Sequence, residues 1–229
     1  MQVSKTRNEI TDTEAWLEDN ALRRPTWSVP APREGAEAGV PPWIPRELEG
    51  RRIVQAIEDQ DHAIALYAKT YWRGRVLLAF DTHRDLVAAY DFSAWSGPQP
   101  RKDGEASDRR ILWALIRDGV LFVSSGHFGY AKASGGRTGY LSAIDLASGE
   151  LLWRSDPLVA NANNFLYEDG YIISGYGFTD EPDFLFVVDA KTGETVTKTK
   201  LRKGPSFILK KGTQVFVRTY DTDYVFDLR

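Results

Sequence analysis

The sequence predicts an all-β fold built from four similar units, and two observations carry this prediction. A short apolar run that ends on an aspartate occurs four times, at 76–81, 140–145, 184–189 and 224–227. Before each of these runs come two further apolar stretches joined by a charged turn, as in residues 115–123. Self-similarity at this scale is typical of a repeat architecture, in which each unit forms one supersecondary element.

Residues 1–50 differ from the rest, and we expect them to form an N-terminal helix followed by an extended, proline-rich arm. Thr11 or Asp12 can cap a helix that continues to about Leu22, since oxygen-bearing side chains accept hydrogen bonds from free amides at helix starts. Six prolines lie between residues 25 and 45. Proline donates no backbone hydrogen bond, so this density excludes a helix or a central strand.

Residues 51–229 form a second, strand-rich domain, which divides into units at about 52–95, 110–156, 163–201 and 205–229. Each unit contains strands A, B, C and D in chain order, but the fourth ends before its strand D. Strand C does not alternate between polar and apolar residues, so both of its faces are expected to be covered. Radially stacked sheets produce this pattern. The prediction is therefore a small β-propeller of four four-stranded antiparallel blades.

The C–D turns explain the closing aspartates. Asp145 and Gly149 have the same spacing as Asp189 and Gly193. An aspartate carboxylate accepts hydrogen bonds from turn amides, and glycine supplies the positive φ that such turns require. In the first unit we expect Asp85 to take the place of the glycine, because aspartate tolerates the left-handed region. These aspartates are interpreted as turn formers rather than catalytic groups.

The segments 139–153 and 184–194 closely resemble the repeat of quinoprotein-like (PQQ-like) β-propellers, and residues 117–123 match the A–B hairpin of that repeat. The resemblance covers about residues 52–229. It implies four-stranded antiparallel blades around a central axis, with Trp153 packed between two blades. The first unit lacks the turn glycine, and the third has Thr197 where the second has Trp153.

Four units leave two possibilities, a closed four-bladed ring or an assembly of open partial rings. Residues 26–30 (Thr-Trp-Ser-Val-Pro) echo residues 153–157 of a strand D. We expect this part of the arm to pair with residues 224–227, which closes the ring and removes a sheet edge. The predicted state is then a monomer, with an arm-swapped oligomer as the alternative.

Composition excludes several classes of function. The net charge of −3 gives no electrostatic footprint for nucleic acid. There is no cysteine for a disulfide or thiolate site, and no apolar run long enough to span a membrane. The polar N-terminus does not read as a signal peptide, so a cytoplasmic location is expected. The quinone-dependent dehydrogenases of the superfamily that this chain resembles are much longer and often carry a vicinal cysteine pair. This chain has neither feature, so no cofactor is predicted.

The B–C and D–A loops of a blade emerge at one end, and this end is the predicted binding face. Its aromatic and charged residues suit a protein partner or a small molecule, although some aromatic rings can simply plug the channel mouth. The acidic groups Asp180/Glu181/Asp183 and Asp221/Asp223 can hold calcium, but a solvated acidic loop is the favoured reading. No metal is predicted, because His62, His83 and His127 share no ligand spacing. The predicted binding residues are Tyr71, Trp72, Arg73, His127, Phe128, Tyr130, Arg137, Asn163, Tyr176 and Phe178.

No nucleophile elbow or phosphate-binding loop occurs in the sequence, so the predicted function is a non-catalytic binding or scaffold propeller. One alternative is a small hydrolase or lyase at the channel mouth, using His127, Tyr130 and the acidic loop residues. Another is a subunit that functions through assembly, with the arm swapped into a neighbour.

Overall fold

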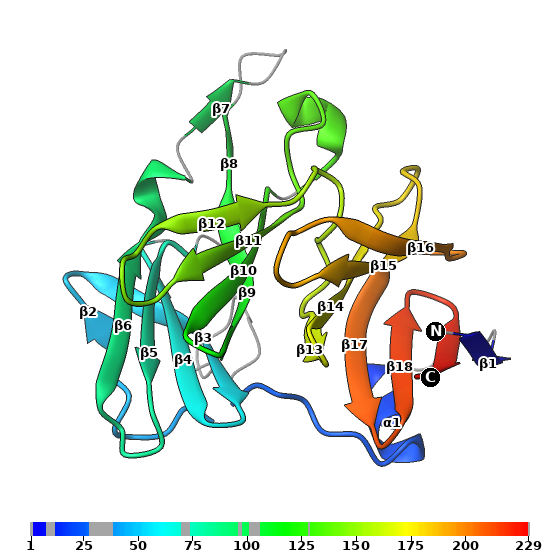
Figure 1. The fold of residues 1–229 in the computed structure, drawn as a ribbon, viewed down its shortest axis with the longest axis horizontal. Coiled ribbons are helices and arrows are strands. Elements are labelled where there is room, and N and C mark those ends of the chain that lie inside the picture. The colour runs from blue at the N-terminus through cyan, green and yellow to red at the C-terminus, as the bar shows by residue number, and fades with distance from the viewer. Residues whose placement is uncertain are drawn as a thin grey trace.

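The computed structural model describes residues 2–7, 12–27, 39–69, 74–95, 98–100, 106–127 and 129–228. Four antiparallel sheets surround a common centre as the blades of a propeller (Figure 1). Within blades 1 to 3 the strands are neighbours in chain order, because consecutive strands pair as antiparallel hairpins. Blade 1 consists of β3 (Arg51–Asp59), β4 (His62–Ala68), β5 (Val76–Phe80) and β6 (Leu86–Asp91).

The other three blades repeat this pattern. Blade 2 consists of β9 (Arg110–Arg117), β10 (Val120–Gly126), β11 (Tyr140–Asp145) and β12 (Leu151–Arg154). Blade 3 consists of β13 (Leu166–Glu168), β14 (Tyr171–Tyr176), β15 (Phe184–Asp189) and β16 (Thr195–Lys200). Blade 4 consists of β17 (Pro205–Lys211), β18 (Gln214–Thr219), β19 (Asp223–Asp227) and the N-terminal strand β1 (Gln2–Arg7).

A few short elements lie outside the blades. Strand β2 (Glu47–Leu48) pairs with the inner strand β3, and β7 (Pro98–Pro100) and β8 (Ala106–Asp108) form a hairpin between blades 1 and 2. The one α-helix of the described residues, α1 (Thr13–Asp19), is capped by Asp12 and is shorter than the helix to Leu22 that we expected. It is too short to cross a membrane. Two 3₁₀ turns are η1 (Phe92–Ala94) and η2 (Ala131–Ser134).

The outer strand of blade 4 comes from the start of the chain. Strand β1 pairs antiparallel with β19, from Gln2 opposite Asp227 to Arg7 opposite Asp223, with one irregularity in the register. The expectation that residues 26–30 pair with 224–227 is therefore wrong. Thr26 instead bridges to Ile57 of the inner strand β3 of blade 1, and residues 28–30 lie outside the described residues. The prediction rested on the similarity between residues 26–30 and residues 153–157. A shared tryptophan and proline do not determine which strand a segment pairs with.

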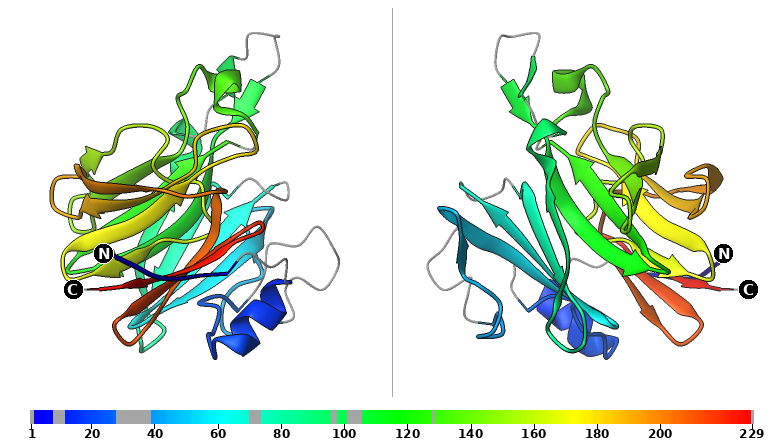
Figure 2. Two further views of the ribbon diagram at one scale, coloured as in Figure 1. Left: turned by 90° about the vertical axis from the view of Figure 1, so that its right-hand side faces the viewer. Right: turned by 60° about the vertical axis from the view of Figure 1, so that its left-hand side comes forward.

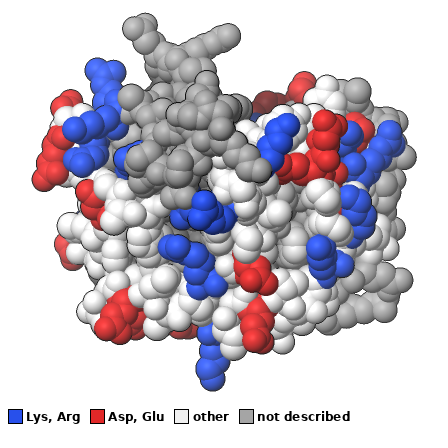
Figure 3. All heavy atoms as spheres, turned by 90° about the horizontal axis from the view of Figure 1, so that it is seen from above, with Lys and Arg blue, Asp and Glu red and all other residues white. Residues whose placement is uncertain are grey.

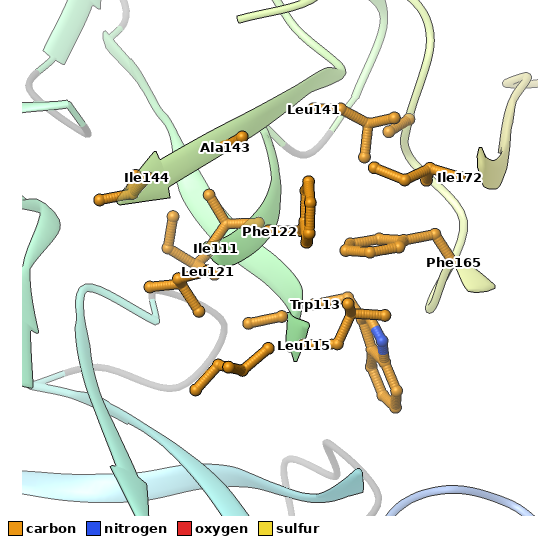
Figure 4. Close-up of a cluster of buried hydrophobic side chains, with 14 of the residues drawn as sticks. Ile111, Trp113, Leu115, Leu121, Phe122, Leu141, Ala143, Ile144, Phe165 and Ile172 are labelled. Carbon is orange, nitrogen blue, oxygen red and sulfur yellow. The ribbon is translucent and has the colours of Figure 1, made fainter. Parts of the chain in front are cut away.

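Blades 1, 2 and 3 share one continuous core. The strand C side chains Leu77, Leu141 and Val188 are all fully buried, as expected for a strand that is covered on both faces. Figure 4 shows Phe122 of blade 2 turned toward Phe165 of blade 3, and both belong to this cluster. A second cluster, which includes Ile173, Leu185, Ile208 and Val217, joins blade 3 to blade 4.

The seam between blades 4 and 1 is built differently, because N-terminal residues fill it. On the open face of blade 4, Trp16 and Leu17 of α1 cover Leu209 and Phe216. On the open face of blade 1, residues 39–48 cover a cluster that includes Tyr67 and Phe80. The described segment 20–27, which follows α1, runs from blade 4 to blade 1 (Figures 1 and 2). There it hydrogen-bonds to β3, with Trp27 N donating to Ala56 O over 3.0 Å.

The C–D turns confirm the structural role of the closing aspartates. Asp145 accepts a hydrogen bond from Ser148 N, and Asp189 accepts hydrogen bonds from the amides of Lys191 and Thr192. Gly149 and Gly193 have φ values of 74° and 77°, as the shared spacing predicts. These hydrogen bonds hold the pKa of both carboxyls below the ordinary aspartate value, since they favour the charged form.

The first blade departs from this rule by one residue. Asp81 accepts hydrogen bonds from the amides of His83 and Asp85, but the residue with a left-handed φ of 71° is Arg84. The prediction that Asp85 takes the glycine position is therefore wrong. This turn closes with Asp81 N donating to Asp85 O, whereas Asp145 N donates to Glu150 O, so the loop of blade 1 is one residue shorter.

Candidate functional site

The B–C loops and the D–A connections lie at the end of the propeller from which η2 and the β7–β8 hairpin project (Figure 1). Figure 3 views this end and shows Lys and Arg groups interleaved with Asp and Glu groups over the described surface. A surface of this kind offers no extended field of one sign, so any recognition here depends on individual side chains. Two features stand out: a cluster of loops between blades 2 and 3, and a cavity in the central channel.

The B–C loops of blades 2 and 3 are fastened to each other, and we call the surface formed by Tyr130, Lys132, Phe178 and Glu181 the loop platform. The rings of Tyr130 and Phe178 meet edge to face with centroids 5.0 Å apart, and the Lys132 ammonium lies 5.3 Å from the Tyr130 ring centroid. Glu181 Oε1 accepts a hydrogen bond from Ala131 N over 2.5 Å. This bond crosses from one blade to the next, so the two aromatic rings are held by an ordered frame.

Tyr176 supports the platform from below rather than presenting its ring to a partner. Its side chain is buried, and its hydroxyl donates to Glu181 Oε2 over 2.5 Å. Burial, followed by this hydrogen bond to a carboxylate, raises the pKa of Tyr176 far above the ordinary tyrosine value. A Cβ atom on Gly139 would lie 2.8 Å from the Tyr176 ring, so glycine at that position is what allows the ring to pack there.

The remaining predicted site residues are spread over this end of the molecule. His127 is half-buried, and its Nε2 donates to Tyr130 O over 3.0 Å, which ties the histidine to the base of the platform. Arg137 and Asn163 are exposed, and Asn163 lies beside the central channel. Four predicted site residues lie outside the described residues: Tyr71, Trp72, Arg73 and Phe128.

Of the acidic loop residues that the sequence analysis interpreted as solvated, Asp180 is exposed, but the other four are partly or fully buried. Asp223 is buried and pairs with Arg218 Nη1 over 2.6 Å, and Asp221 pairs with Arg202 over 3.5 Å. Asp183 is also buried, and the loss of solvent raises its pKa, an effect that Lys200 and Lys203 partly offset. Within the described residues no cluster of three histidines or acids is arranged to hold a metal ion.

The central channel contains a cavity of about 270 Å³, lined by blades 1, 2 and 4 and by the segment that precedes blade 3. Its walls are largely apolar, with polar groups at a few points. Arg24, on the N-terminal segment that fills the seam, also lines it. The other lining residues that matter for binding are Gln55 and Leu66 of blade 1, Arg110 and Trp113 of blade 2, Asn163 before blade 3 and Phe207 of blade 4.

Arg24, Gln55 and Arg110 were not among the binding residues predicted from the sequence. Arg24 follows the predicted helix, and nothing in the sequence showed that this segment reaches the central channel. Gln55 offered the clearest missed signal, because it is a polar residue between the apolar pairs Ile53–Val54 and Ala56–Ile57 of strand A. A polar side chain among such residues needs a polar partner or an opening such as the channel.

No family model and no curated protein matches the chain. Its structure is similar to the C-terminal WD40 domain of Sif2, with a TM-score of 0.50 and 11% identity over 80% of this chain and 45% of that one. It is also similar to the computationally designed Ika4 protein, with a TM-score of 0.48 and 14% identity over 82% of this chain and 99% of that one. A quinohemoprotein alcohol dehydrogenase from Pseudomonas putida HK5 gives a TM-score of 0.44 and 14% identity over 71% of this chain and 27% of that one.

These comparisons and the sheet topology define the chain as a β-propeller of four blades. At 11–14% identity the similarity concerns the fold alone. The propeller fold that the resemblance implies is supported, but the PQQ-like type of repeat stays a prediction, since propellers of other repeat types match as well. The chain spans less than half of the WD40 domain and of the dehydrogenase.

Proposed function

We propose that the chain is a binding propeller that engages a protein partner through the loop platform. The observation that supports this is the cross-blade frame of Glu181, which holds Tyr130 and Phe178 edge to face at the propeller end. Both rings are half-buried and so keep part of their surface available. Rigid aromatic residues flanked by cations are the residues on which binding energy at protein interfaces concentrates.

Lys132 is exposed and supplies positive charge beside the Tyr130 ring, and Arg137 is an exposed cation of the same B–C loop. The surface therefore suits a partner segment that offers an apolar side chain next to an acidic one. No described feature favours the hydrolase or lyase that the sequence leaves open. Glu181 is committed to the frame, and the described residues that line the cavity include no carboxylate, imidazole or amine. The cytoplasmic location stays a prediction.

Site-specific photocrosslinking tests the proposal. A photoreactive amino acid placed at Lys132 should capture a defined partner in cell extract, whereas the same group at Lys191, in a C–D turn at the opposite end, should not. Tyr130→Ala should then weaken binding of that purified partner at least about 10-fold, or 1.4 kcal/mol. Lys191→Ala is the matched control and should leave the affinity unchanged.

Tyr176→Phe separates the frame from the surface, because it removes only the hydroxyl that Glu181 accepts. We expect a smaller loss of affinity than for Tyr130→Ala, together with faster hydrogen exchange at the Ala131 amide. Capture of the same partner from both ends, or an undiminished affinity in Tyr130→Ala, would place the binding surface elsewhere.

A further inference from the structure

The geometry points to a second binding site, independent of the loop platform: we propose that the central cavity binds a small monocarboxylate with an aromatic or branched aliphatic body. The cavity is about 270 Å³ in volume. This is just below the ~300 Å³ at which pockets for drug-sized ligands begin, so the ligand is a single ring or a short chain.

A side-chain amide of blade 1 supplies a polar group at the cavity wall. Gln55 lines the cavity and is only 7% exposed. Its carboxamide offers both hydrogen-bond donors and an acceptor at an otherwise largely apolar wall. A ligand oxygen that accepts a hydrogen bond from Gln55 Nε2 would therefore be paired inside the cavity.

Arg24 gives the site its preference for an anion. Its Nε is buried and has no hydrogen-bond partner, while its guanidinium lies 5.0 Å from the ring centroid of Phe207. The far side of the guanidinium is already engaged, since Nη2 pairs with Glu14 Oε1 over 2.5 Å. The Glu14 side chain is 71% exposed, so solvent screens this pair and part of the positive charge of Arg24 is left for the cavity.

The other cation and the walls define the rest of the ligand. Arg110 adds a second guanidinium, and none of the described residues that line the cavity is acidic. A carboxylate oxygen is the acceptor that both an amide and a guanidinium N–H serve best. The rest of the described lining is largely apolar and includes Leu66, Ile111 and Trp113. A neutral polar ligand would lack the charge interaction with the two guanidinium groups, and these groups would repel a cation.

The test uses the full chain and three ring probes of similar size: 4-fluorobenzoate, 4-fluorobenzamide and 4-fluorobenzylamine. Fluorine NMR and calorimetry should detect saturable binding of the benzoate, at least 10-fold weaker binding of the benzamide and none of the benzylamine. Gln55→Leu should weaken benzoate binding at least 10-fold. Leu66→Phe, which fills the cavity with an apolar ring, should abolish binding while circular dichroism shows an intact fold.

Two controls separate this site from other causes. Lys191→Ala should bind benzoate as the native chain does. Tyr130→Ala should do so as well, which keeps the result independent of the loop platform. The proposal is overturned if benzoate does not saturate the protein at millimolar concentration, if Leu66→Phe binds it unchanged, or if the benzamide or the benzylamine binds as tightly as the benzoate.

Discussion

Three seams of this propeller are alike, and the fourth is not. Between blades 1 and 2, 2 and 3, and 3 and 4, the apolar face of one repeat packs directly on the face of the next. Between blades 4 and 1, two apolar faces are each covered by N-terminal residues. Each repeat packs only on its immediate neighbours. The outer faces of the first and last repeats therefore need other residues to cover them.

The N-terminal residues solve three problems of the last seam at once. Strand β1 pairs with the exposed edge of β19, α1 covers blade 4, and residues 39–48 cover blade 1. An unpaired strand edge and two apolar faces are each a route to aggregation. The fourth seam should therefore fail as a unit when its covering segment is removed, whereas the other seams should respond to single side chains.

Deletion of residues 1–48 is expected to have the largest effect. It exposes the apolar faces of blades 1 and 4 together with the edge of β19, so the protein should aggregate or lose its cooperative thermal transition. Light scattering after size-exclusion chromatography and differential scanning calorimetry measure both outcomes. A truncated chain that is monomeric and melts at the native temperature would show that the repeats close by themselves.

Deletion of residues 1–7 alone is the graded control. It removes β1 but leaves α1 and residues 39–48 in place, so both apolar faces stay covered. We expect a smaller loss of melting temperature and a concentration-dependent dimer, formed when two free edges of β19 pair.

A single tryptophan should distinguish the two kinds of seam. Trp16 is 2% exposed and packs on Leu209 and Phe216, so Trp16→Ala should cost about 3–5 kcal/mol of unfolding free energy. Trp153 lies in the seam of blades 2 and 3, where its Nε1 donates to Ala190 O over 2.9 Å, but it is only half-buried. Trp153→Ala should cost less, about 2 kcal/mol, in urea titrations of both variants. The opposite ranking would make the repeat seam the weaker one.

The ion pairs of the two seams lead to a related prediction. Arg117 of blade 2 holds Asp59 of blade 1 with two bonds of 2.7 Å, and Asp59 is 9% exposed. At the fourth seam Arg23 pairs with Glu58, but the Arg23 side chain is 75% exposed. Arg117→Met should cost about 2–4 kcal/mol, since it leaves a largely buried carboxylate without its cation. Arg23→Met should cost less than about 1 kcal/mol. Equal losses in chemical denaturation would contradict the comparison.

The repeats could be predicted from the sequence because each unit repeats the same local chemistry. Aspartate and glycine at fixed spacing define a turn, and an apolar run that does not alternate defines a strand covered on both faces. These signals are short-range, and the strands of blades 2, 3 and 4 lie close to where they indicate. In blade 1 the predicted position of the left-handed turn residue was wrong by one residue. It is Arg84 and not Asp85, because this turn lacks the glycine that marks the position in blades 2 and 3.

The seam and the site could not be predicted because both depend on contacts between segments far apart in the chain. The residues of Gln2–Arg7 give no local signal that this segment pairs with β19, since the segment is polar and lacks the repeat pattern. Arg24 lines the cavity next to residues of blades 1, 2 and 4, which are distant from it in the chain. Tyr130 and Phe178 were selected as loop aromatics, but their partnership depends on Glu181, whose role in joining two blades no spacing reveals.

Two glycines with the same backbone conformation allow a finer test of the repeat seams. Gly149 and Gly193 occupy equivalent C–D turns, with φ values of 74° and 77°. A Cβ at Gly193 would lie 2.5 Å from the Trp153 ring, whereas a Cβ at Gly149 would approach nothing closer than 3.9 Å. Gly149→Ala should cost about 1 kcal/mol, the price of a left-handed alanine. Gly193→Ala should cost about 1–2 kcal/mol more, because the ring must move.

The extra cost of Gly193→Ala should disappear in a Trp153→Ala background, where the ring is absent. A double-mutant cycle in urea measures this coupling directly. If the two alanine variants are equally stable in the native background, Trp153 does not pack on the neighbouring turn.

The smallest effect is a pH dependence confined to the fourth seam. Tyr67 of blade 1 is fully buried beneath residues 39–48, and its hydroxyl donates to Pro45 O over 2.8 Å. Burial raises the pKa of Tyr67 to about 12, although Arg46 lowers it in part. The folded state keeps the phenol neutral, while the unfolded chain ionises near pH 10. The stability that this neutral phenol contributes is therefore complete below pH 10 and is lost as the pH rises toward 12.

Tyr67→Phe should lower the melting temperature at pH 8, because Pro45 O loses its donor at a cost of about 1 kcal/mol. Phenylalanine cannot ionise, so the difference between native chain and variant should shrink, and then change sign, as the pH rises from 9 to 11.5. Lysine deprotonation affects both proteins equally and cancels in the difference. Tyr171→Phe, at an exposed position, should follow the native profile throughout. Parallel melting curves for the native chain and Tyr67→Phe would mean that residues 39–48 do not bury Tyr67, and that blade 1 is covered in some other way.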